Sequence, residues 1–99
     1  GENISSAEVE TVLCQHPEVA EVAIVGRPDP VLGERVAAFI VPAEGSAPPD
    51  ASSIEKFAEG RLAAYKLPET VVPVDVLPRT ATGKVEKFRL RKQLEEQGD

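Results

Sequence analysis

Apolar residues near the start of the chain recur at the spacing of one helical face, and this spacing predicts an amphipathic helix. The positions i, i+3, i+4 and i+7 of that face are Val9, Val12, Leu13 and His16. The segment Ser5-Ser6-Ala7-Glu8 fits a capping box, in which the Ser5 hydroxyl and the Glu8 carboxylate close the first turn. We expect the helix to end at Pro17, which cannot continue its hydrogen bonds.

Two apolar runs follow, and both predict strands. Residues 19–25 are mostly β-branched or small and apolar, which favours a buried strand. Residues 35–41 form the second run, and Pro42 stops it. The segment 26–33 between them contains two prolines that cannot donate to a strand ladder, so we expect a loop there.

A second helix is predicted after a surface loop at 43–50, which is rich in Pro, Gly and Ser. The segment Ser52-Ser53-Ile54-Glu55 fits another capping box. The face that follows has one polar member and ends before Pro68. Its residues are Ile54, Phe57, Ala58, Arg61, Leu62 and Tyr65.

The last third of the chain predicts a strand, a loop and a helix. Residues 71–77 form the strand, and Pro73 within it indicates an edge position or a bulge. Residues 78–83 form the loop, and 86–96 the final helix. The complete order predicts an α+β fold: a small three-stranded sheet packed with about three helices in a two-layer to three-layer sandwich.

Length and composition fit one small domain. The 99 residues are 41% hydrophobic and 28% charged, typical of a soluble globular chain, and no apolar run approaches the length of a membrane span. The single Cys14 excludes an internal disulfide, and no zinc-ligand spacing is present, so we expect no metal site and a cytoplasmic location. Without Met and opening on Gly1, the chain is expected to be a piece of a longer protein.

The charge is unevenly distributed. The chain carries a net charge of −6, but residues 79–92 contain six basic residues and one acidic residue, a net +5, which leaves −11 elsewhere. A protein that binds nucleic acid would normally be basic overall, so we expect no nucleic-acid partner. A basic segment on an acidic body favours a small anionic ligand or an acidic neighbour.

The segment 78–84, Pro-Arg-Thr-Ala-Thr-Gly-Lys, invites comparison with a phosphate-binding P-loop. Pro78 stands where that motif needs its first glycine, and Val85 stands where it needs a hydroxyl for magnesium, so we reject the P-loop. What remains is Lys84 after Gly83, on a loop whose base is stiffened by Pro78. Such a lysine suits charge that develops on a carboxylate oxygen and an α-phosphate. On these residues alone, a solvated lysine in a turn competes with that interpretation.

Four landmarks in order resemble the C-terminal domain of the adenylate-forming superfamily, which includes acyl-CoA synthetases, luciferases and peptide-synthetase adenylation domains. The resemblance covers nearly the whole chain, and the opening and the Pro-Asp-Pro loop are more similar to acyl-CoA synthetases. The landmarks are Gly1-Glu2-Asn3-Ile4 with Ala7-Glu8-Val9-Glu10, residues 19–34, Tyr65-Lys66-Leu67-Pro68, and Leu77-Pro78-Arg79-Thr80 with Gly83-Lys84.

The resemblance implies that residues 1–99 are the single, mobile C-terminal domain of an ATP-dependent acyl- or aryl-CoA ligase, without its large N-terminal domain. In such enzymes the residue matching Lys84 assists acyl-adenylate formation, and the domain then rotates to present the face that matches Gly1 for thioester formation. ATP with Mg²⁺, CoA and a carboxylic acid are the implied substrates of the full-length enzyme. The isolated domain is expected to hold none of them and to be inactive.

Further residues receive roles through the same resemblance. Tyr65 matches an aromatic that can lie against the CoA adenine, or it completes the apolar face of its helix. Lys66 could contact a CoA phosphate, or it is solvated. An exposed Lys84 also implies a lysine acyltransferase as a partner. Two other functions remain open: an adenylation domain that loads a carrier protein, and a stand-alone regulatory or interaction module.

Overall fold

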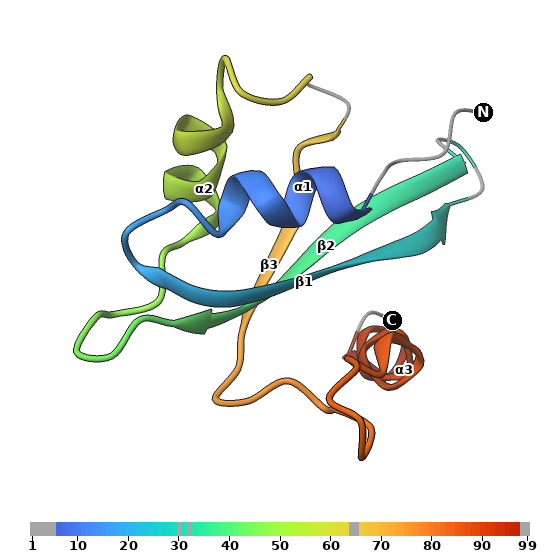
Figure 1. Cartoon of the computed structure of the whole chain (residues 1–99). Coiled ribbons are helices and arrows are strands. Elements are labelled where there is room, and N and C mark those ends of the chain that lie inside the picture. Colours follow the sequence, from blue (N-terminus) through green and yellow to red (C-terminus); the bar gives the residue numbers. More distant parts are fainter. Residues whose placement is uncertain (1–5, 30, 32, 64–65, 98–99) are drawn as a thin grey trace.

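The computed structural model describes residues 6–29, 31, 33–63 and 66–97, which form three helices and three strands. Figure 1 shows their arrangement. In chain order the elements are α1 (Ser6–Leu13), β1 (Val19–Asp29), β2 (Gly33–Pro42), α2 (Ala51–Ala58), β3 (Thr70–Pro73) and α3 (Lys87–Gln97). The predicted α+β fold is confirmed. No helix in the described ranges is long and apolar enough to cross a membrane.

The sheet is mixed, with β2 between β1 and β3. Strands β1 and β2 pair antiparallel, from Val19 opposite Pro42 to Asp29 opposite Gly33. Strand β3 pairs parallel to β2. A parallel neighbour requires a crossover connection, and the segment that contains α2 provides it.

Helices cover both faces of the sheet, so the domain has three layers (Figure 1). Helices α1 and α2 lie on one face and α3 on the other. The core on the α1/α2 face consists of Val9, Leu13, Val19, Val22, Ile24, Val36, Ala38, Ile40, Ile54, Ala58 and Leu62. The core on the α3 face consists of Ala23, Val25, Ala37, Phe39, Leu77, Leu90 and Leu94.

The central position of β2 in the sheet explains why its sequence does not alternate between apolar and polar residues. Ala38 and Ile40 belong to the core on the α1/α2 face, whereas Ala37 and Phe39 belong to the core on the α3 face. A strand that is buried on both faces has an almost continuous apolar sequence.

The loop predicted at 26–33 is much shorter in the structure, because β1 ends at Asp29 and β2 begins at Gly33. Strands β1 and β2 continue through most of it, and Gly26 pairs with Val36 and Pro28 with Glu34. Proline is tolerated at a sheet edge, because alternate backbone N–H groups there have no partner strand, and β1 is an edge strand.

Helix α2 differs from its prediction at both ends. Its N-cap is Asp50 rather than Ser52, and the Asp50 carboxylate accepts a hydrogen bond of 2.8 Å from the Ser53 backbone N–H. The helix ends at Ala58 because Gly60, with a φ of 80°, turns the chain away. The predicted capping residue Ser5 of α1 lies outside the described residues.

The third strand is shorter than predicted, since β3 ends at Pro73 rather than at Leu77. Its edge position is confirmed by the strand order. Leu77 is nevertheless buried against α3, so the segment after β3 packs as an irregular chain.

His16 joins the end of α1 to α2. Its Nδ1 accepts a hydrogen bond of 3.0 Å from the Glu18 backbone N–H, so the proton of the neutral ring lies on Nε2, which donates to the Ser53 hydroxyl at 3.1 Å. The ring is buried and lies 5.0 Å from the Phe57 ring. His16 therefore has a structural role at the junction of α1 and α2.

Phe39 provides a test of this packing, because its side chain is fully buried between β2 and α3. Phe39→Ala should lower the free energy of unfolding by about 3–5 kcal/mol, through lost apolar contact and the cavity left behind. Urea denaturation of the 99-residue chain measures this value. The control Val76→Ala, at a position that is 73% exposed, should change it by less than about 0.5 kcal/mol. Equal effects at the two positions would contradict the assigned core.

Candidate functional site

Lys84 lies in a short hairpin between β3 and α3. Arg79 and Val85 form an antiparallel bridge at its base. The Thr80 N–H donates to the Lys84 carbonyl at 2.8 Å, and the Gly83 N–H donates to the Thr80 carbonyl at 2.9 Å. These bonds close a three-residue loop, and we refer to residues 79–85 as the Lys84 hairpin.

Gly83 is required by the backbone conformation of this hairpin. Its φ is 91°, in the left-handed region, and three-residue hairpin loops place a glycine in that conformation. A Cβ atom on Gly83 would meet no other atom within 4 Å, so conformation and not space selects glycine here.

Further bonds hold the hairpin. The Thr80 hydroxyl accepts a hydrogen bond of 3.2 Å from the Lys84 N–H and lies 3.0 Å from the Thr82 hydroxyl. At the base, the Glu86 N–H donates to the Pro78 carbonyl at 2.8 Å. The predicted supporting residues Pro78 and Gly83 thus both take part in the closed turn.

The Lys84 side chain projects from this turn and is exposed. In residues 6–29, 31, 33–63 and 66–97, no hydrogen bond or ion pair to its ammonium group is found. Its neighbouring cations differ, because Arg79 pairs with Glu21 and Lys87 pairs with Glu10. The arrangement leaves Lys84 as a cation able to approach an anionic group outside the domain.

Arg79 is a functional candidate that sequence reasoning did not single out. Its Nη1 donates to the Gly83 carbonyl at 2.8 Å, and its Nη2 bonds to the Glu21 carboxylate on β1. One signal was available in the sequence: Glu21 is the charged residue within the otherwise apolar run 19–25.

A second ion pair ties the start of α3 to the outer edge of β1. The Lys87 ammonium lies 2.8 Å from the Glu10 carboxylate. The same carboxylate oxygen accepts a hydrogen bond of 2.8 Å from the Ile24 backbone N–H. The start of the Lys84 hairpin and the helix that follows it are therefore each connected to β1 through an acidic side chain.

These pairs change the interpretation of the basic segment 79–92. Arg79, Lys87 and Arg89 each have an acidic partner, and the partner of Arg89 is Glu86 at 3.1 Å. The segment is therefore less available to a large polyanion than its net charge of +5 suggests.

Lys66, the remaining predicted site residue among those described, does not lie with Lys84. The Lys66 ammonium lies 2.6 Å from the Glu8 carboxylate of α1, and its side chain is 20% exposed, so it is not a freely solvated lysine. Helix α1 covers one face of the sheet, whereas the Lys84 hairpin leads into α3 on the opposite face (Figure 1). Gly1 and Tyr65 lie outside the described residues.

Cys14 does not have the properties of a nucleophile. Partial burial raises the pKa of its thiol, and the charges of Glu10 and Glu21 raise it further, while a hydrogen bond with the Val22 backbone acts in the opposite direction. A thiol with a raised pKa is mostly protonated and weakly reactive at neutral pH.

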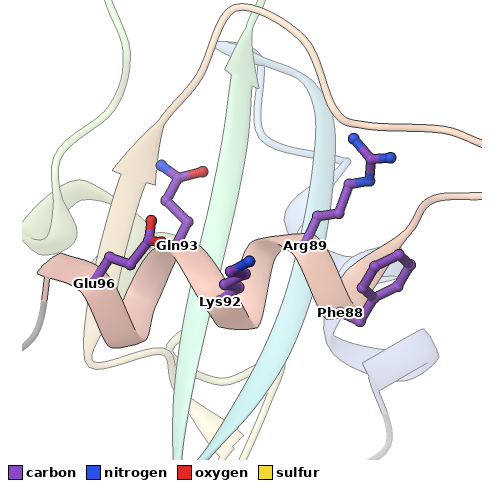
Figure 2. Close-up of a pocket in the computed structure, with 5 residues that line it drawn as sticks. All are labelled: Phe88, Arg89, Lys92, Gln93 and Glu96. Carbon is purple, nitrogen blue, oxygen red and sulfur yellow. The ribbon is translucent and has the colours of Figure 1, made fainter.

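A shallow hollow lies along the outer side of α3 (Figure 2). Its lining residues are Phe88, Arg89, Lys92, Gln93 and Glu96. Phe88 is 61% exposed, and the Arg89 guanidinium carbon lies 5.9 Å from its ring centroid. Lys84 does not line this hollow. Within the described ranges, no group of three or more His, Cys, Asp or Glu residues could hold a metal ion.

Comparison with known proteins assigns the family. Indoleacetate–CoA ligase of Aromatoleum aromaticum is 53% identical over 91 residues, which is 92% of this chain and 18% of the ligase. Triostin synthetase I of Streptomyces triostinicus is 49% identical over 92 residues, 92% of this chain and 17% of the synthetase. The crystal structure of an acyl-CoA synthetase from Brucella canis superposes with a TM-score of 0.90 at 36% identity, over 100% of this chain and 19% of that one.

The chain thus spans less than a fifth of the length of these relatives. The family model of the AMP-binding enzyme C-terminal domain matches residues 8–84, a segment that ends on Lys84 itself. The match covers most of the chain and agrees with the identities above, so this chain belongs to the AMP-binding enzyme C-terminal domain family.

Proposed function

We propose that residues 1–99 are the mobile C-terminal domain of an AMP-forming acid–CoA ligase, and that Lys84 is its catalytic residue. One observation carries the proposal: Lys84 is exposed at a closed hairpin, and no partner for its ammonium is found in the described part of the chain. Such a lysine can enter the active site of a neighbouring domain without first breaking an ion pair.

The chemistry of the first half-reaction suits this cation. A carboxylate oxygen of the acid forms a bond to the α-phosphorus of ATP while the bond to the bridging oxygen breaks, so acyl-AMP forms and pyrophosphate leaves. Negative charge is spread over the oxygens around phosphorus in the transition state. The Lys84 ammonium, placed beside these oxygens by the Gly83 turn, stabilises that charge without transferring a proton.

The second half-reaction requires the opposite face of the domain. In it the CoA thiol attacks the acyl carbon and AMP leaves. Lys66 and Glu8 lie on the α1 side of the sheet, away from the hairpin that leads into α3. Rotation of the whole domain would therefore withdraw Lys84 and bring the face with Lys66 toward the acceptor. The resemblance implies that Gly1 and Tyr65 act in the same step. The Lys66–Glu8 pair supports a role in which Lys66 fixes this surface or exchanges Glu8 for a CoA phosphate.

ATP and CoA serve the full-length enzymes of this family. The described residues of this domain offer no ligand set for Mg²⁺, so we derive no step through that ion. The acid and the adenine nucleotide are assigned to the large N-terminal domain, which is the partner that this proposal requires.

A carrier-loading adenylation domain is the second candidate function. The specific observation in its favour is the 49% identity to a protein that is named a synthetase and not a CoA ligase. The two functions share the adenylation step and differ in the acceptor. Supplying the full-length enzyme with its acid, ATP and either CoA or a phosphopantetheinyl carrier protein distinguishes them.

The exposure of Lys84 also supports control by a lysine acyltransferase. Acylation would remove the positive charge of the ammonium group and with it the interaction proposed for adenylation. Mass spectrometry of the full-length protein isolated from its own cells tests whether Lys84 is acylated.

Replacement of Lys84 should affect the two half-reactions differently. In the full-length enzyme, Lys84→Ala should slow acyl-AMP formation by about 100- to 1,000-fold, because a preorganised charge in the transition state is lost. Thioester formation from supplied acyl-AMP should stay close to the wild-type rate. Pyrophosphate release and acyl-CoA formation measure the two steps. The control Lys56→Ala removes an exposed lysine from α2 and should alter neither. Equal loss of both half-reactions in Lys84→Ala would contradict the assigned role.

The reverse pattern is expected for Gly1→Leu. We propose that Gly1 lies beside the path of the pantetheine arm in the second orientation, where a leucine side chain would obstruct the thiol. Thioester formation from acyl-AMP should fall while pyrophosphate release continues. A Gly1→Leu enzyme with normal thioester formation would argue against this placement.

The 99-residue chain by itself should form no acyl-AMP from acid and ATP. Its only proposed contribution to adenylation is a charge, and the pockets for acid and nucleotide are assigned to the other domain. Radiolabelled pyrophosphate exchange into ATP is a sensitive assay. Exchange above background with the purified chain, absent from the Lys84→Ala chain, would overturn the proposal.

A further inference from the structure

We infer that Arg79 and Glu21 are positioning residues for Lys84, which together fix the orientation of the Lys84 hairpin on the sheet. The inference rests on the proposed catalytic role of Lys84. It concerns a different question, namely which groups outside the reacting centre direct the ammonium.

The first argument is the peptide group that Arg79 holds. The Gly83 carbonyl belongs to the peptide unit directly before the Lys84 Cα atom. Its oxygen accepts from Arg79 Nη1 at 2.8 Å, while the N–H of the same unit donates to the Thr80 hydroxyl at 3.2 Å. The Lys84 carbonyl in turn accepts from the Thr80 N–H at 2.8 Å.

Three backbone groups around the Lys84 Cα are thus fixed, and they set the direction in which its side chain leaves the hairpin. This restraint matters at Gly83 in particular, because glycine has the greatest backbone freedom of all residues. Without the Arg79 bond, the Gly83–Lys84 peptide would keep only its 3.2 Å bond to the Thr80 hydroxyl, and the direction of the ammonium would be less restrained.

The second argument is the connection to the sheet. The Arg79 guanidinium is planar, and it bonds to Gly83 through Nη1 and to Glu21 through Nη2. The first bond lies within the hairpin and the second joins it to β1, so the rigid plane of the guanidinium couples the Gly83 peptide to the sheet. Residues 21 and 79 are 58 positions apart in the chain, so this contact is purely tertiary.

The third argument is an irregularity in β1 that places Glu21. Val19 pairs with Pro42 and Glu21 with Val41, so the register shifts by one residue at Ala20. Val19 belongs to the core on the α1/α2 face, whereas Ala23 and Val25 belong to the core on the α3 face.

In a regular strand, residues 19, 21, 23 and 25 would all share one face. The shift moves Val19 to the other face and leaves Glu21 on the α3 face, toward the hairpin. Bulges of this kind re-aim side chains beside functional sites.

Because the Arg79–Glu21 ion pair is exposed, we expect it to orient the Lys84 hairpin and not to stabilise the fold. The Arg79 and Glu21 side chains are 41% and 44% exposed. Ion pairs this exposed contribute little to folding, because water and salt screen them. A measured effect on one half-reaction, without an effect on unfolding, is therefore the signature of positioning.

The test uses the full-length ligase that carries this domain. Arg79→Gln and Glu21→Gln should each lower the rate of acyl-AMP formation by about 10- to 100-fold, the range expected when a catalytic group is displaced by about 1 Å. Thioester formation from supplied acyl-AMP should stay near wild type, and so should the melting temperature. The double variant should be no slower than the slower single variant, since both changes remove the same restraint.

Arg79→Lys separates positioning from charge. A lysine keeps the positive charge but cannot bond to the Gly83 carbonyl and Glu21 from one rigid plane. We expect this variant to remain impaired in adenylation. Full activity of Arg79→Lys would show that only the charge matters, and it would overturn the inference.

Two control variants match these changes. Arg61→Gln removes another exposed arginine whose Nη1 donates to a carbonyl four residues away, that of Phe57 at 2.7 Å, on the opposite side of the sheet. Glu44→Gln removes an exposed carboxylate from the loop after β2. Both should adenylate at the wild-type rate.

The inference fails if Arg79→Gln and Glu21→Gln adenylate normally, if their effects multiply in the double variant, or if both half-reactions fall equally. Lys84→Ala in the same assay separates this failure from that of the proposed function. If Lys84→Ala is slow and the Arg79 variants are normal, the positioning inference alone is wrong. If Lys84→Ala is itself normal, the proposed function is wrong.

Discussion

Burial of β2 on both of its faces is the constraint on which the rest of the domain depends. Ala38, Phe39 and Ile40 are completely inaccessible to solvent, and their side chains alternate between the two cores. A sheet with two apolar faces must be covered twice, so α1 and α2 occupy one side and α3 the other. The two proposed functional surfaces are separated for the same reason: Lys66 pairs with Glu8 on α1, and the Lys84 hairpin leads into α3.

Charged side chains protect the outer edge of β1, where no fourth strand pairs with the sheet in the described part of the chain. An exposed edge presents unpaired backbone groups that invite pairing with another chain. Here the Ile24 N–H donates to the Glu10 carboxylate, which also pairs with Lys87, and the Gly26 carbonyl accepts a long bond of 3.4 Å from Arg91. Charged side chains from α1 and α3 thus cover the edge, and they connect it to the Lys84 hairpin.

The comparisons establish the family of the domain, and the acceptor of the second half-reaction is a question for experiment. A protein named indoleacetate–CoA ligase and a protein named triostin synthetase I are similarly identical to this chain, at 53% and 49%. A domain that contributes one cation to adenylation is compatible with either acceptor, because the cation acts before the acceptor enters.

The sequence by itself determined the elements whose signals are local. The apolar run of β2, the final helix and the glycine turn before Lys84 were all predicted, because burial on two faces, helical spacing and a left-handed φ each constrain neighbouring residues. The extent of β1 was decided by its pairing with β2, which overrode the local signal of the prolines in 26–33. The cap at Asp50 and the end of α2 at Ala58 follow from local groups, the Asp50 carboxylate and Gly60, which the prediction did not use. The contacts of Arg79 with Glu21 and of Lys66 with Glu8 each join residues 58 positions apart. No local pattern specifies such pairs, because only the packed sheet brings their charges together.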